Sequence, residues 1–143
     1  MTVRPIPEGF HTVTPYLVVS DPALLIDFLK AAFDAQEIER NVEASGRVAH
    51  ALVRVGNSMV MIGGATEKHP PQPSMLYLYV RDTEATYRAA MQAGGDSLMK
   101  PTLQFYGDLN AAVLDPCGNQ WWIATHVEDV SPEEIAKRMK ARK

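Results

Sequence analysis

The side chains that could do chemistry are few, and they are spread widely along the chain. Histidines occur at positions 11, 50, 69 and 126, and Cys117 is the single cysteine. Separations of tens of residues do not bring histidines together, so His11, His69 and His126 are expected to be surface or hydrogen-bonding residues. Cys117 lies in a turn without a neighbouring base, which favours a structural role over a nucleophilic one. No residue is therefore assigned a catalytic role.

His50 differs from the other three histidines because it lies within a segment that has the pattern of a β-strand. Side chains alternate between the two faces of a strand, so His50 shares its face with Leu52 and Arg54. Two roles are compatible with this position. His50 is either a structural histidine with satisfied hydrogen bonds or an acid or base that faces a cavity.

Aromatic side chains offer another kind of chemistry, which is stacking against a flat molecule. The only two tryptophans are adjacent, at Trp121 and Trp122, and they follow a turn that contains Asp115, Pro116 and Gly118. Neighbouring residues of a strand point to opposite faces of the sheet. Trp121 is expected beneath a helix, and Trp122 is expected on the opposite face.

Composition indicates one soluble globular domain. The chain has 143 residues, of which 46% are apolar and 22% charged, enough to bury a sizeable core. A net charge of −3 argues against a nucleic-acid-binding surface. No segment approaches the ~20 apolar residues of a membrane span, and a single cysteine excludes an intrachain disulfide. We therefore expect a cytoplasmic protein without a nucleic-acid or membrane partner.

The order of expected elements is strand, helix and three strands, and this order occurs twice. Helix starts are indicated by Asp21 followed by Pro22, by Asp82, and by a capping box from Ser131 to Glu134. Strands are expected at 12–19, beginning at 37–40, and at 48–55, 59–62, 75–80, 97–100, 110–114 and 121–123, and helices at 23–33, at 83–93 and from 131 onward.

An internal repeat supports this order. Residues 16–21 align with 77–82 at an offset of 61 (82 minus 21), and 56–59 align with 118–121 at an offset of 62 (118 minus 56). Both alignments fall at strand boundaries. The chain is therefore interpreted as one domain, 1–143, that contains two βαβββ modules. Module one spans about 10–64, a proline-rich linker 65–73, module two about 74–126, and a terminal helix 131–143.

These paired modules, the Asp115–Asn119 turn before the last strand and the ending 123–130 resemble the vicinal oxygen chelate superfamily. This superfamily contains glyoxalases, bleomycin-resistance proteins and ring-cleaving dioxygenases. The resemblance covers almost the whole chain. It implies an α+β fold whose curved mixed sheets enclose a central cavity, with the helices outside. It also implies a homodimer.

The resemblance further implies four positions at which metal-dependent members place His, Gln or Glu. Those positions are held here by Thr14, Val60, Met75 and Trp122. A hydroxyl, an isopropyl group, a thioether and an indole cannot replace imidazole and carboxylate around a divalent ion. We therefore expect neither the metal site of this family nor a cofactor.

The cavity is instead expected to be aromatic and weakly polar. Strand alternation places the tyrosines of the first and fifth strands on its face, and the loop 105–108 lies at its mouth. The residues predicted to bind a ligand are Thr14, Tyr16, His50, Val60, Met75, Tyr77, Tyr79, Tyr106, Asp108 and Trp122.

Three functions are compatible with these residues. The first is binding or sequestration of a small aromatic or hydrophobic molecule without a metal, as in bleomycin-resistance proteins. The second is a metal-dependent lyase, isomerase or dioxygenase with relocated ligands, such as His50 with Asp108 or Glu43. The third is a non-catalytic structural module with a fully packed interior.

Overall fold

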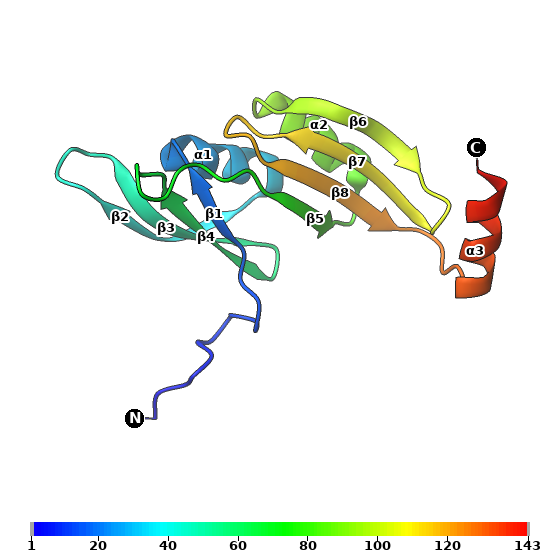
Figure 1. The fold of residues 1–143 in the computed structure, drawn as a ribbon, viewed down its shortest axis with the longest axis horizontal. Helices are drawn as coiled ribbons and strands as arrows, with labels where there is room; N and C mark the ends of the chain where they lie inside the picture. The colour runs from blue at the N-terminus through cyan, green and yellow to red at the C-terminus, as the bar shows by residue number, and fades with distance from the viewer. Residues whose placement is uncertain (1, 143) are drawn as a thin grey trace.

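The protein consists of two mixed four-stranded sheets, each of which carries a helix on the same side (Figure 1). The computed structural model describes residues 2–142. The predicted α+β fold with two βαβββ modules is confirmed. In chain order the elements are β1 (Tyr16–Val19), α1 (Pro22–Phe33), β2 (Gln36–Val42), β3 (Val48–Val55), β4 (Ser58–Gly64), β5 (Met75–Tyr79), α2 (Thr83–Gln92), β6 (Asp96–Leu103), β7 (Asp108–Leu114), β8 (Gln120–His126) and α3 (Pro132–Ala141).

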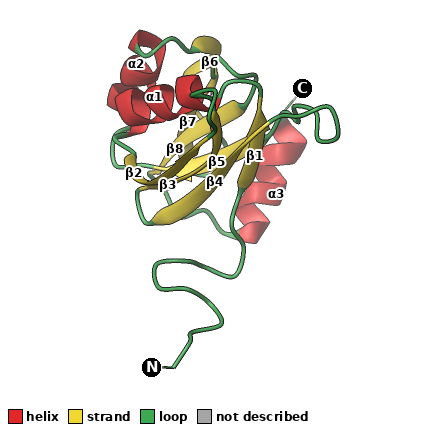
Figure 2. Cartoon of the chain, turned by 90° about the vertical axis from the view of Figure 1, so that its left-hand side faces the viewer, coloured by secondary structure: helices red, strands yellow, loops and turns green. Residues whose placement is uncertain are grey.

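The two sheets have the same topology. Their strand orders are β1-β4-β3-β2 and β5-β8-β7-β6, with β1 parallel to β4 and β5 parallel to β8. Helices α1 and α2 pack against each other on one side of the strands (Figure 2), whereas α3 lies beyond the end of the second sheet (Figure 1). No strand pair joins the sheets within residues 2–142, so the sheets do not close around a cavity in a single chain. Each sheet keeps one face free of helices, and this is called its open face below.

Helix α1 begins and ends as its sequence predicts. The Asp21 side chain accepts a hydrogen bond from the backbone N–H of Leu24 at 3.2 Å, and Pro22 occupies the first turn, where its missing N–H costs nothing. Asp34 ends the helix in the left-handed conformation, with φ of 55°. The buried face between these ends packs on the first sheet.

The core lies between the helices and the sheets. Trp121 is only 1% exposed, and its ring lies 5.2 Å from that of Phe33 at the end of α1, so its predicted place beneath the helices is confirmed. Val60, Ile62 and Ile123 belong to the same buried cluster. Burial on this scale contributes about 1.5–3 kcal/mol for each large apolar side chain.

The turn that precedes β8 is organised by the buried carboxylate of Asp115. One oxygen accepts the backbone N–H groups of Cys117 and Asn119, at 2.7 and 3.0 Å. The other accepts the Asn119 side chain at 3.0 Å and the Trp121 indole N–H at 2.7 Å. These four hydrogen bonds fix both the turn and the side of the sheet to which Trp121 points.

Several strand boundaries differ from the prediction, and the largest difference is at the start of the first strand. The first strand begins at Tyr16 rather than at residue 12, and Pro15 contributes only its carbonyl, which accepts the Met61 N–H at 2.9 Å. A proline has no N–H to donate to a ladder. Strand β6 extends from Asp96 to Leu103, beyond the predicted 97–100, and register shifts interrupt its pairing with β7.

The linker between the modules covers one edge of the first sheet. It makes a turn in which Thr66 N–H donates to the His69 carbonyl at 2.8 Å, and it then forms a bridge between Gln72 and Val18 of β1. Among residues 2–142, no helix is long and apolar enough to cross a membrane. The terminal helix α3 begins at a cap in which Ser131 Oγ accepts the Glu134 N–H at 3.1 Å.

Replacing Asp115 by alanine should destabilise the protein strongly, because it leaves the buried N–H groups of Asn119 and Trp121 without an acceptor. We expect the free energy of unfolding to fall by about 3 kcal/mol or more, measured by urea denaturation. The control is Asp96→Ala, at an exposed position, where the change should stay within about 0.5 kcal/mol. Equal losses in both variants would contradict the structural role of Asp115.

Candidate functional site

The strand register gathers a set of exposed aromatic side chains on the open face of the second sheet. Tyr77 of β5 is paired with Trp122 of β8, and Tyr79 is paired with Ala124. Met75, Tyr77 and Tyr79 are 63%, 42% and 66% exposed. The residues between them point the other way, toward the helices. The open face of module two is therefore an accessible aromatic surface.

A buried carboxylate anchors the two tyrosines of this surface. The hydroxyls of Tyr77 and Tyr79 both donate to Asp108 Oδ2, at 2.7 and 3.0 Å. Asp108 is the first residue of β7 rather than part of an exposed loop as expected, and it is only 3% exposed. The two phenol rings lie 5.4 Å apart in an edge-to-face arrangement. Two rings with an exposed surface are thus held in fixed positions by one acceptor.

A buried amide extends this network toward the loop that follows β6. Asn110 is fully buried and its Nδ2 donates to the hydroxyls of Tyr77 and Tyr106, at 3.1 and 2.8 Å. Its Oδ1 accepts from Gln104 Nε2 at 2.9 Å. Tyr106 therefore belongs to the same hydrogen-bond network as Tyr77 and Asp108, and it lines the same site.

The hydrogen bonds determine which groups of the site are charged. Burial alone raises the pKa of Asp108, but the hydrogen bonds from Tyr77, His126 and Tyr79 outweigh it and hold that pKa below its ordinary value. The pKa of Tyr77 is raised far above its usual range, mainly because the phenol is partly buried and also because it donates to the Asp108 carboxylate. The bond to Asp108 also raises the pKa of Tyr79. The carboxylate is ionised, and the phenols are neutral donors.

His126 lies between two carboxylates at the end of β8. Its Nδ1 is 2.9 Å from Asp108 Oδ1, and its Nε2 is 2.7 Å from Asp129 Oδ1. Both ring nitrogens can donate to these acceptors only when the imidazole is protonated. The bond to Asp108, and then that to Asp129, raises the pKa of His126. The two carboxylates therefore favour the protonated form of His126, which balances the charge of the buried Asp108 carboxylate.

The loop that carries Tyr106 is held by its own backbone and by the terminal helix. Gly107 adopts φ of 102°, and a Cβ there would lie 2.1 Å from the Glu128 carbonyl oxygen. Arg138 of α3 donates to the Phe105 carbonyl at 2.9 Å and pairs with Glu128 at 3.1 Å. Module two thus closes one end of the site with a fixed loop.

Two of the predicted site residues of module one, Tyr16 and His50, lie on the open face of the first sheet. The Tyr16 ring lies 5.8 Å from that of His50. A Cβ on Gly63 would lie only 2.6 Å from the Tyr16 hydroxyl, so this glycine leaves room for the tyrosine. His50 therefore faces the open side of its sheet. Thr14 lies in the irregular segment before β1.

The expected position of Val60 on the open face is wrong. Val60 is 3% exposed and belongs to the core beneath the helices, and its neighbour Met61 occupies the position that corresponds to Trp122. Arg54 and Met59 are paired across four residues, 55–58, whereas the corresponding Leu114 and Gln120 are paired across five, 115–119. The prediction aligned the two turns by their shared Gly-Asn pairs, which shifted β4 by one residue relative to β8. A shift of one residue moves every side chain of a strand to the opposite face.

The side chains at the four family positions do not fit a divalent cation. With the register corrected, these positions are held by Thr14, Met61, Met75 and Trp122, which supply two thioethers, a hydroxyl and an indole. Within residues 2–142 no three His, Cys, Asp or Glu side chains are grouped in a way that could hold a metal ion. The alternative ligands His50 and Asp108 are also separated, because His50 lies on the first sheet and Asp108 on the second, whereas Glu43 follows β2 in the module of His50.

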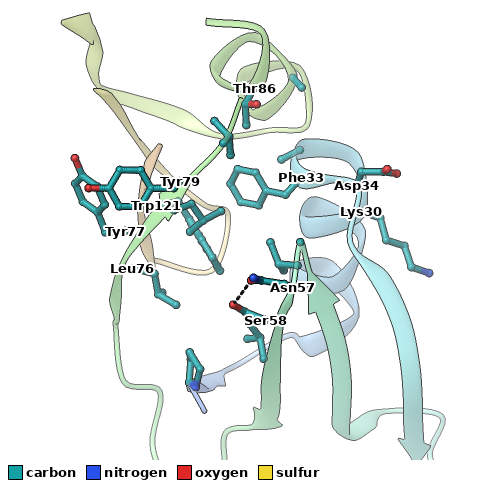
Figure 3. Close-up of a pocket in the computed structure, with 18 of the residues that line it drawn as sticks. Lys30, Phe33, Asp34, Asn57, Ser58, Leu76, Tyr77, Tyr79, Thr86 and Trp121 are labelled. Carbon is teal, nitrogen blue, oxygen red and sulfur yellow. Dashed lines mark hydrogen bonds between the residues drawn. The ribbon is translucent and has the colours of Figure 1, made fainter. Parts of the chain in front are cut away.

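A wide cleft separates the two modules beside β5. Its volume is about 1380 Å³, and its lining includes Phe33, Trp121, Leu76 and Val60. In Figure 3 the rings of Phe33 and Trp121 lie near each other in this cleft, whereas Tyr77 and Tyr79 project on the far side of the β5 ribbon. The cleft and the aromatic surface therefore share β5 as their boundary.

Sequence reasoning identified six members of this site, including the anchoring carboxylate of Asp108, but missed the polar residues that bond to them. Met75, Tyr77, Tyr79, Asp108 and Trp122 lie on one open face, and Tyr106 is joined to them through Asn110. His126 was expected to be a surface or hydrogen-bonding residue, and Asn110, Gln104 and Asp129 were not considered. The alternation of Asp108 and Asn110 along β7 is the signal that could have placed the amide beside the carboxylate.

Replacing Gly107 by alanine should displace the loop that carries Tyr106, because the new Cβ meets the Glu128 carbonyl. Gly46→Ala is a matched control, since Gly46 also has positive φ, of 91°, but a Cβ added there would meet no atom within 4 Å. We expect Gly46→Ala to cost about 1 kcal/mol in urea denaturation, and Gly107→Ala clearly more. Equal costs would show that the Glu128 contact is unimportant.

The raised pKa of His126 predicts a pH-dependent stability. The ion pairs of His126 contribute fully to the free energy of unfolding below about pH 6, where the imidazole is protonated in the folded and the unfolded state. This contribution is lost as the pH rises through the raised pKa of the folded state. The urea midpoint of the wild type should therefore exceed that of His126→Gln at about pH 5.5, and the difference should shrink toward about pH 9. A difference that does not change with pH would contradict the paired imidazolium.

Comparisons with known proteins agree with this geometry. Residues 9–123 match the Glyoxalase/Bleomycin resistance protein/Dioxygenase superfamily. Uncharacterized protein Mb0911c of Mycobacterium bovis is 31% identical over 141 residues, which is 91% of this chain and 93% of that protein.

Solved structures share the fold at lower identity. TioX from Micromonospora sp. ML1 superposes with a TM-score of 0.71 at 21% identity, over 82% of this chain and 99% of that chain. A superfamily member from Sphaerobacter thermophilus superposes with a TM-score of 0.66 at 19% identity, over 80% and 96% of the two chains. At these identities the similarity concerns the fold alone. The match over most of the sequence shows that the chain belongs to the Glyoxalase/Bleomycin resistance protein/Dioxygenase superfamily.

Proposed function

We propose that the chain binds a small, flat aromatic or hydrophobic molecule on the open face of module two, through stacking and hydrogen bonds and without a metal ion. The observation that carries this proposal is the pair of exposed rings of Tyr77 and Tyr79, fixed by one buried carboxylate. A rigid exposed ring loses little conformational freedom when it stacks on a ligand. Trp122, in the same row of the sheet, adds a third aromatic group.

The polar groups of the site suit orientation of a ligand better than chemistry on it. The phenols of Tyr77 and Tyr79 have raised pKa values, so they are poor bases, and Asp108 already accepts three hydrogen bonds. His126 is occupied at both ring nitrogens. Binding or sequestration therefore accounts for the site without any further group.

The two other candidate functions have less support. The relocated ligands His50 and Asp108 would have to be gathered from two sheets, no three His, Cys, Asp or Glu side chains within residues 2–142 are grouped to hold a metal ion, and the family positions carry thioethers and an indole. A purely structural module would bury its aromatic residues, whereas Tyr79 is 66% exposed beside an open cleft. The homodimer expected from the family resemblance is likewise a proposal, and the position of β5 at the edge of its sheet supports it.

Binding can be tested by tryptophan fluorescence, with bleomycin and a panel of neutral flat aromatic compounds as probes and EDTA present throughout. Two substitutions at one position separate stacking from hydrogen bonding. Tyr79→Phe keeps the ring and should change the affinity for a bound probe by about twofold or less, whereas Tyr79→Leu should weaken it about tenfold.

Either of two results would reject the proposal. One is an unchanged signal across the whole panel, and the other is equal binding by Tyr79→Phe and Tyr79→Leu. Binding that appears only when EDTA is replaced by a divalent metal would favour the metal-dependent alternative.

A further inference from the structure

The rings of Tyr77 and Tyr79 lie across the second sheet rather than upright on it. Both residues belong to β5, whereas Asp108, which their hydroxyls reach at 2.7 and 3.0 Å, belongs to β7. Strand β8 lies between β5 and β7, so the two rings must extend over β8. Ala124 of β8, on the same face, is fully buried, because its small side chain leaves room for the rings above it.

The angle between the two rings limits what they can bind together. Their planes are inclined by 63°, and their centroids are 5.4 Å apart. A flat molecule can stack face to face on one ring of such a pair but not on both, whereas a compact, rounded group can contact both rings at once. Trp122 is paired with Tyr77 on the neighbouring strand and adds an indole beside them. The aromatic surface is therefore shaped for a rounded group next to a flat one.

The electronic character of the rings favours a positive charge in that rounded group. The π electrons of an aromatic ring give its faces a partial negative charge, which attracts cations. Here the attraction is strengthened, because both phenols donate their protons to the ionised carboxylate of Asp108. Such a hydrogen bond polarises the donor and increases the negative charge on its oxygen and ring. Tyr77 and Tyr79 are therefore better partners for a cation than free phenols would be.

The charged side chains of the open face favour a cation as well. Among residues 2–142, the paired positions of this face carry two carboxylates, Asp96 and Asp108, and neither lysine nor arginine. The basic residue at a paired position is His126, which is held between Asp108 and the exposed Asp129. Even with His126 protonated, these three carboxylates and one imidazolium give a net charge of −2 (one minus three). The field at the surface therefore attracts positive ligands.

We propose that the ligand of this surface carries a substituted ammonium group, which contacts the rings of Tyr77 and Tyr79 beside the Asp108 carboxylate. The inference rests on the proposed binding function and narrows its ligand class to organic cations. An ammonium group with three or four alkyl substituents is rounded and weakly hydrated, so it leaves water at little cost. It also needs few hydrogen bonds, which suits a surface whose phenol protons are already donated to Asp108. A flat part of the same ligand can stack on Trp122.

Two probes of the same shape test the proposal in the full-length chain. These are (meta-hydroxyphenyl)trimethylammonium and meta-tert-butylphenol, which differ only in a charged nitrogen in place of a carbon. Tryptophan fluorescence with EDTA present should give a dissociation constant about tenfold lower for the cation. Equal affinities, or tighter binding of the neutral probe, would overturn the inference and leave the proposed binding function standing. If neither probe binds, the inference fails, and the panel of neutral flat compounds decides separately whether the binding function fails too.

A pair of matched variants locates the cation. Tyr79→Leu removes a ring from the surface, whereas Tyr16→Leu makes the same change on the first sheet; the two side chains are 66% and 51% exposed, so the fold is retained. The preference for the cationic probe should fall to about threefold or less in Tyr79→Leu and stay near tenfold in Tyr16→Leu. Equal preferences in the two variants would overturn the proposal.

Proton NMR of the cationic probe gives an independent measurement. Protons above the face of an aromatic ring are shifted upfield by its ring current, so the N-methyl signal should move upfield when the probe binds to the wild type. The shift should be smaller at saturation of Tyr79→Leu than of Tyr16→Leu. Binding to the wild type without an upfield shift would overturn the proposal, because the ammonium group would then lie away from the rings.

Discussion

The arrangement of the second module depends on the buried carboxylate of Asp115. A charge placed out of water is tolerated only when donors surround it, and here two backbone N–H groups, an amide and an indole converge on its two oxygens. The indole belongs to Trp121. Because successive residues of a strand point in opposite directions, holding Trp121 in the core also directs Trp122 to the open face. A turn that precedes the strand thus determines which side chain the strand presents on its open face.

The same principle recurs at the other end of the sheet with a different outcome. Asp108 is also a buried carboxylate with converging donors, but these donors are the exposed phenols of Tyr77 and Tyr79 and the imidazole of His126. Asp115 therefore stabilises the core, whereas Asp108 arranges a surface. The contrast explains how a sheet face can present large aromatic groups to solvent without leaving them mobile.

The fold was predictable from the sequence because its signals are local and repeated. Helix caps such as Asp21 and Ser131, the proline-rich linker and the recurring strand order each involve residues close in sequence. The site was predictable in part, because alternation along β5 is sufficient to place Tyr77 and Tyr79 on one face. Val60 was misplaced because the turn before β8 has one residue more than the turn before β4. Both turns contain a Gly-Asn pair, so an alignment on this pair does not reveal the difference. The partners of Asp108 come from separate strands, and no pattern within one segment reveals them.

The attachment of the terminal helix to the loop at Phe105 gives the end of the chain an influence on the site. Arg138 bonds the Phe105 carbonyl and Glu128, and the Arg142 guanidinium lies 4.4 Å above the centre of the Phe105 ring. The next residue, Tyr106, is a wall of the aromatic surface. A displacement of the end of α3 would therefore also displace the loop that carries Phe105 and Tyr106. A tag, a fusion partner or a protease acting there would alter the shape of a surface formed some thirty residues earlier in the sequence.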